Sequence, residues 1–90
     1  MFEVMDNRIN LIIDNEIVGY IIYDEEKDCI VGSYIYVNPE KRGKGLSSKL
    51  IQKFVELSKE KKKKILPTCP VIKQVLESLY KDVLYDNLNK

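Results

Sequence analysis

The sequence predicts a single α/β (α+β) domain over residues 1–90, in which an antiparallel meander is followed by a βαβ crossover and a C-terminal helix. Three runs rich in β-branched residues lie in the first half, and the short polar turns between them favour antiparallel neighbours. After Pro39 the apolar residues change to helical spacing, and a short apolar run then separates two helical patterns. Ninety residues make one small domain, so we expect these elements to share one mixed sheet.

The predicted strands of the meander cover residues 8–14, 16–24 and 29–37. The pair Asp14-Asn15 is a good turn signal, and a polar cluster over 24–28 marks the next turn. Gly32, in the middle of the third strand, suggests a bulge or a close backbone approach. Strict alternation along this strand predicts two faces, one with Val31, Ser33, Ile35 and Val37 and the other with Ile30, Gly32, Tyr34 and Tyr36.

The second half predicts a helix from about Gly45 to about Lys61, because its apolar residues recur at helical spacing. A short strand over residues 65–68 follows, and Pro70 fits the first turn of another helix. A strand, a helix and a second strand form a right-handed crossover between parallel strands. The residues from 81 onward have no clear pattern.

The composition limits the class of protein. A hydrophobic content of 44% and a charged content of 32% are typical of a globular chain, and the net charge of +1 favours neither nucleic acid nor an acidic partner. No apolar run approaches the roughly 20 residues of a membrane span, and the N-terminus lacks an apolar signal segment. Two cysteines without a CxxC pair indicate a reducing cytoplasm. The chain contains no histidine, so we expect no metal site and few candidates for a general base.

A glycine-containing turn separates the third strand from the first helix. The N–H groups at the start of a helix have no internal partners, and glycines let the backbone approach an anion closely. The segment 42–47 therefore has the features of a phosphate-binding loop, although a plain glycine turn before a surface helix explains the pattern equally well. It matches neither a Walker A loop nor a dinucleotide GxGxxG fingerprint.

The run Arg42-Gly43-Lys44-Gly45-Leu46-Ser47 resembles motif A of the GNAT acetyltransferase superfamily, and Val37-Asn38-Pro39-Glu40 before it also fits. The chain as a whole is similar to the small stand-alone GNAT-like proteins over roughly residues 8–85, including the segment PTCPVIKQVLESLYKDVL. The resemblance implies a GNAT-like mixed sheet that binds acetyl-CoA as a cosubstrate. The implied binding residues are Ile35, Val37, Arg42, Gly43, Lys44, Gly45, Leu46 and Ser47, with backbone N–H groups near Ile35 to Val37 as an oxyanion hole.

The candidate catalytic residues are Cys69 and Tyr34. Cys69 precedes Pro70 as the expected N-cap of the last helix, where it either lies beside the thioester, carries the acetyl group transiently, or is simply a buried cap. Tyr34 occupies a position where the subfamily usually has a histidine. This departure, together with Ser47 in place of a smaller residue, separates the chain from the usual pattern.

The resemblance implies an acetyl-CoA-dependent N-acetyltransferase that acts on an unidentified amine. The alternative is a non-catalytic CoA-binding or protein-interaction module, which the missing histidine favours. The lysine run 61–64 could bind nucleic acid, but no aromatic residues interleave it, so we expect a solvated helix end and no nucleic-acid or membrane partner. We expect a cytoplasmic monomer.

Overall fold

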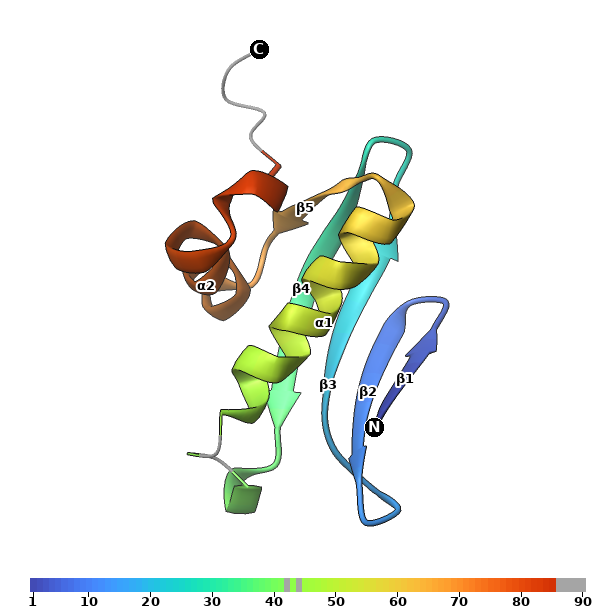
Figure 1. The fold of residues 1–90 in the computed structure, drawn as a ribbon, viewed down its shortest axis with the longest axis vertical. Coiled ribbons are helices and arrows are strands. Elements are labelled where there is room, and N and C mark those ends of the chain that lie inside the picture. The colour runs from blue at the N-terminus through green and yellow to red at the C-terminus, as the bar shows by residue number, and fades with distance from the viewer. Residues whose placement is uncertain (42, 44, 86–90) are drawn as a thin grey trace.

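A computed structural model describes residues 1–41, 43 and 45–85. It contains a five-stranded sheet in the order β1-β2-β3-β4-β5, with helix α1 packed across one face (Figure 1). All neighbouring strands are antiparallel except β4 and β5, which are parallel. This mixed sheet with its two helices confirms the predicted fold class. The bounds are β1 Phe2–Met5, β2 Arg8–Ile13, β3 Glu16–Glu25, β4 Cys29–Val37, α1 Leu46–Lys61, β5 Lys64–Pro67 and α2 Pro70–Leu79.

Strand β1 was not predicted from the sequence. It pairs with β2 from Phe2↔Leu11 to Met5↔Arg8, and three of its four residues are exposed. The strands that were predicted, and both helices, begin or end within a residue or two of their expected bounds. At the turn between β2 and β3, Asp14 and Asn15 both have positive φ (52° and 62°), which agrees with the predicted turn pair.

Strand β4 contains a bulge directly after Gly32, where the sequence suggested a bulge or a close approach, and the predicted alternation did not include it. Ile22 of β3 pairs with Tyr34 and Tyr23 pairs with Gly32, so Ser33 is the extra residue on β4. The side chains on either side of Ser33 are therefore out of phase, and the predicted two faces are wrong. Ile30 and Gly32 share the α1 face with Ile35 and Val37, whereas Tyr34 and Tyr36 lie on the opposite face.

Gly32 lies at a close approach between the sheet and the helices, as the sequence suggested. A Cβ at this position would lie 2.8 Å from an atom of the Phe54 ring and 3.4 Å from Ile72. Phe54 is fully buried in the core between α1 and the sheet, and its ring centre is 5.5 Å from that of Tyr23. Because Gly32 has no side chain, α1 and α2 can both pack against β4 at this point.

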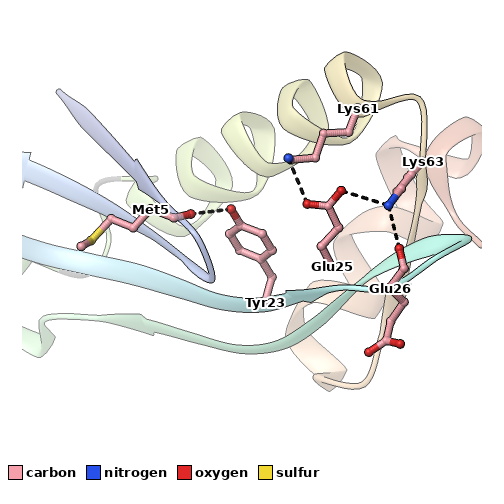
Figure 2. A network of polar contacts seen from close by, with 6 residues as sticks. All are labelled: Met5, Tyr23, Glu25, Glu26, Lys61 and Lys63. Carbon is pink, nitrogen blue, oxygen red and sulfur yellow. Dashed lines mark hydrogen bonds and ion pairs between the residues drawn. The ribbon is translucent and has the colours of Figure 1, made fainter.

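The end of α1 is joined to the β3–β4 hairpin by an ionic network (Figure 2). Glu25 accepts contacts from Lys61 at 3.0 Å and from Lys63 at 2.9 Å, and Lys63 also donates a hydrogen bond to the backbone oxygen of Glu26. Hydrogen bonds from Lys63 and Lys61 lower the pKa of Glu25 below its ordinary value of 4.5. Two lysines of the run 61–64 thus have a structural partner.

The chain after β5 returns to the sheet. Helix α2 is followed by a 3-10 turn, Lys81–Val83, after which Leu84 forms a parallel bridge with Ile65 and the Tyr85 N–H donates to the Ile65 oxygen. This contact covers part of the outer edge of β5. Over the described ranges, no helix is long and apolar enough to cross a membrane.

Candidate functional site

The candidate site lies where β4 and β5 diverge. Their parallel pairing ends at Gly32↔Pro67, whereas β4 continues to Val37. The lower part of β4 in Figure 1 therefore extends beyond β5, with the start of α1 next to its carboxyl end. Ligands of sheets with parallel strands bind outside the carboxyl ends of those strands.

The backbone of β4 directs N–H groups into this divergence. Asn38 donates its N–H to the Val18 oxygen, which makes Gly19↔Val37 a non-hydrogen-bonded pair of the antiparallel ladder. Two residues earlier, Ile35 has the same parity, so its N–H points away from β3 and toward the β5 side. The bulge at Ser33 sets this parity for the residues that follow it.

The start of α1 leaves backbone donors without a partner inside the helix. Gly43 and Gly45 have φ of 83° and 73°, a conformation that glycine adopts without a steric penalty. Gly45 is the N-cap and has no side chain to close the helix end, and the first turn contains no acidic residue. The N–H groups of Leu46, Ser47 and Ser48 therefore have no partner within the helix. Among the described residues, a Cβ at either glycine would meet no atom within 4 Å, so open space faces this backbone there.

The sequence-predicted loop residues fall into three groups. Leu46 is buried in the core at 6% exposure, so it can contribute to a site only through its backbone N–H. Ser47 is half-buried beside it, and Gly43 and Gly45 are exposed. Arg42 and Lys44 lie outside the described residues. A role for any of these residues in binding stays a prediction.

Cys69 lies at the point where the chain leaves β5. It is the N-cap of α2, as predicted, and its N–H donates to the Gly32 oxygen at 3.4 Å, next to the same oxygen's bond with Thr68. The side chain is 9% exposed and belongs to the core that α1 covers. Cys69 is thus on the α1 side of the sheet, at the top of the divergence, and not on its opposite face.

Tyr34 belongs to a cluster of three tyrosines on the face of the sheet that α1 does not cover. Its ring centre is 6.2 Å from that of Tyr20, which stacks on Tyr36 at 5.2 Å. Tyr34 is half exposed, whereas Tyr20 and Tyr36 are partly covered. Tyr34 lies on this open face and Cys69 lies in the core on the α1 face, so the structure does not bring the two candidate catalytic side chains onto one face.

Sequence reasoning missed the polar residues beside the tyrosines. The Arg8 guanidinium lies over the Tyr20 ring, with its Cζ 4.0 Å from the ring centre. Its Nε donates to Asn10 Oδ1 at 2.7 Å, and Asn10 Nδ2 donates to Glu3 Oε1 at 3.1 Å. The signal that could have found them was period-2 spacing, because Arg8, Asn10 and Tyr20 alternate with core residues on adjacent strands.

A surface hollow of about 510 Å³ lies away from this region. Glu77, Ser78, Lys81 and Leu84 line it, at the carboxyl end of α2. Cys69 is at the other end of the same helix. The hollow and the candidate site at the divergence of β4 and β5 are therefore separate parts of the surface.

Comparison with known families gives a match over residues 8–83 to the family described as GCN5-related N-acetyl-transferase. The matched range begins at the first residue of β2 and ends at the last residue of the 3-10 turn after α2. It therefore includes the divergence of β4 and β5, the start of α1 and Cys69. Comparison with curated proteins gives no match.

Solved structures of acetyltransferases have the same fold. A GCN5-like protein from Staphylococcus aureus is 26% identical with a TM-score of 0.75, and the match covers 94% of this chain and 87% of that one. A ribosomal-protein-alanine N-acetyltransferase from Brucella melitensis is 21% identical (TM-score 0.65), with coverage of 88% and 64%. An aminoglycoside N-acetyltransferase in complex with CoA is 18% identical (TM-score 0.61), with coverage of 84% and 60%. The chain thus spans less than two thirds of the two enzymes named last.

Proposed function

Because the chain belongs to the GCN5-related N-acetyltransferase family, we propose that it binds acetyl-CoA at the start of α1 and transfers the acetyl group to an amine. The observation that carries this proposal is the uncapped start of α1, with Gly45 in a left-handed conformation at the carboxyl end of β4. Several N–H groups converge there with the positive end of the helix dipole, and open space faces them. These are the donors that a diphosphate needs.

We assign the remaining residues of the site to the thioester end of the ligand. The pantetheine arm would run from the start of α1 along the free part of β4 toward Cys69. The Ile35 N–H points into this divergence and is the candidate donor to the carbonyl oxygen of the acetyl group, where negative charge develops during attack. When bound, acetyl-CoA supplies the acetyl group as an activated thioester.

The amine would approach from the tyrosine-covered face of the sheet. Its nitrogen forms a bond to the acetyl carbon, the carbon–sulfur bond breaks, and the proton lost from the nitrogen is balanced by one taken up by the departing thiolate. Tyr34, half exposed on that face, is the candidate proton donor. Holding the two reactants in line would supply much of the rate. Cys69, buried at the far end of the divergence, would shape the pocket around the sulfur or accept the acetyl group transiently.

The test combines binding and turnover. CoA binding is measured by calorimetry, and acetyl transfer is measured as free thiol released from acetyl-CoA in the presence of a mixture of primary amines, with mass spectrometry of the products. We expect both binding and amine-dependent release. Binding without any release, in the parent and in Tyr34→Phe alike, would support the alternative of a non-catalytic CoA-binding module, which the absence of histidine favours. No binding at all would contradict the proposed site.

A further inference from the structure

We propose that Arg8 is an anion-binding residue on the open face of the sheet, and that the acetyl acceptor is an amine with a carboxylate at its far end. This inference rests on the proposed acetyl transfer for the identity of the amine end. The anion site itself rests on the contacts of Arg8 alone. The open face is the one opposite α1, which carries Arg8, Asn10, Tyr20, Tyr34 and Tyr36.

The Arg8 guanidinium is held in a fixed position. The Tyr20 ring supports its plane at 4.0 Å, and the bond from Nε to Asn10 Oδ1 is short at 2.7 Å. Asn10, 3% exposed, is itself fixed by the hydrogen bond from its Nδ2 to Glu3 Oε1. A hydrogen bond to a buried amide restricts the rotamers of the arginine, so less conformational entropy is lost when a ligand binds.

The two terminal amino groups of Arg8 have no acceptor among the described residues. No carboxylate of the described chain lies within ion-pair distance of them, and Glu3 bonds to Asn10 instead. The four N–H donors of these groups therefore have no acceptor among the described residues, on a half-buried guanidinium. The planar fork of arginine matches the two oxygens of a carboxylate, which is the chemistry we assign to this end of the acceptor.

The sheet register connects Arg8 to the candidate transfer site. Arg8 pairs with Ile22 and Ile22 pairs with Tyr34, so the three residues form one row across β2, β3 and β4. Two strand spacings, about 10 Å, separate Arg8 from Tyr34 at the edge where β4 and β5 diverge. An extended aliphatic chain could lie on the tyrosine rings between these points, with its carboxylate at Arg8 and its amine at the divergence. Arg8 would thus select acceptors by charge and by length.

The test uses octanoate as a probe of the anion site. The acceptor is the aminooctanoate whose amine lies at the end opposite the carboxylate. Octanoate is titrated while backbone amide resonances of the open face are followed by NMR in the parent, in Arg8→Met and Arg8→Lys, and in Lys64→Met as a control that removes an exposed cation on β5. The Nε–H resonance of Arg8 is followed as well in the parent and in Lys64→Met. We expect octanoate to shift the Arg8 resonance, and Arg8→Met to weaken its binding about tenfold, as expected when a hydrogen bond to a charged group is lost. Arg8→Lys should fall between, because it keeps the charge without the planar fork, and Lys64→Met should bind as the parent does.

The acceptor part is tested with acetyl-CoA and matched amines. The parent should prefer aminooctanoate over octylamine by about tenfold in kcat/KM, and Arg8→Met should lose this preference through KM. An aminoalkyl phosphate of the same length distinguishes phosphate from carboxylate at Arg8, and a preference for it would overturn the assignment of the carboxylate. Equal octanoate affinity in the parent and Arg8→Met would overturn the anion site, as would self-association through the open face that buries Arg8. Octanoate binding without acetyl transfer to any amine would refute the proposed function and the acceptor assignment while leaving the anion site intact.

Discussion

An acidic residue at the start of α1 should stabilise the fold and weaken CoA binding at the same time. The substitution Ser47→Asp places a carboxylate in the first turn, where the chain has no acidic residue and no side-chain cap. An acid at this position is favoured by the helix dipole by about 0.3–1 kcal/mol, which corresponds to a rise in Tm of roughly 1–8 °C for a domain of this size. Opposite effects on stability and affinity separate a binding defect from a folding defect.

The loss of affinity follows from charge repulsion. If a phosphate of CoA lies about 5 Å from the new carboxylate, each pair of charges repels by about 1–3 kcal/mol at an effective dielectric constant between 80 and 20. This corresponds to a decrease in CoA affinity of roughly 5- to 150-fold, which should become smaller as salt is added. Thermal or urea unfolding measures the stability, and calorimetry measures the affinity.

Ser78→Asp is the matched control, because it makes the same chemical change at an exposed position in the last turn of α2. An acid near a helix C-terminus is slightly unfavourable, so this variant should lose a little stability and keep the parent's CoA affinity. If Ser47→Asp gains stability and still binds CoA as the parent does, the pyrophosphate does not lie at the start of α1 and the reasoning fails.

Three further predictions follow from the core, the ionic network and the cysteine. Gly32→Ala should reduce the free energy of unfolding by about 1–3 kcal/mol in urea titrations, because its Cβ would lie 2.8 Å from the Phe54 ring; an unchanged value would show that the ring moves aside freely. The ion pairs that lower the pKa of Glu25 stabilise the fold at pH values above its ordinary pKa of 4.5, and this contribution is lost as the pH falls through the lowered pKa. Glu25→Gln should therefore make the free energy of unfolding depend less on pH in that window. Acid unfolding curves that coincide with the parent's would refute this. Cys69→Ser should abolish any labile acetyl adduct seen by intact-mass analysis after incubation with acetyl-CoA while CoA binding persists, and an adduct that survives would place the acetyl group elsewhere.

The turn between β2 and β3 and the start of α2 could be predicted because their signals lie in a few consecutive residues. The turn at Asp14 and Asn15 requires positive φ at two residues, and both residue types tolerate it, so the hairpin was readable from the pair itself. Cys69 before Pro70 marked the start of α2 for a similar reason, because proline suits the first helical turn. Strand β1 was missed because it is short and mostly exposed, so it has neither a periodic nor a buried pattern.

Contacts between distant segments could not be predicted in this way. The ionic network at Glu25 joins residues 38 positions apart, and nothing in the local sequence selects Lys63 over its neighbouring lysines. The support of Arg8 by Tyr20 and Asn10 likewise depends on the β2–β3 register. The candidate loop was found by its glycines, whereas the direction of the Ile35 N–H became visible only with the bulge in place.

The bulge at Ser33 makes this position tolerant of changes in side chain and in strand length. The Ser33 side chain is exposed and its hydroxyl bonds only weakly to the Ile22 oxygen at 3.3 Å, so most small polar replacements should be accepted. A deletion of the same residue would remove the bulge and keep both faces of the strand, because Gly32 and Tyr34 would become neighbours opposite Tyr23 and Ile22, their present partners. Tyr34 and Tyr36 would stay on the open face, and the Ile35 amide would still point away from β3. In a library of variants, codon 33 should therefore be permissive to substitutions and should also accept a single-codon deletion.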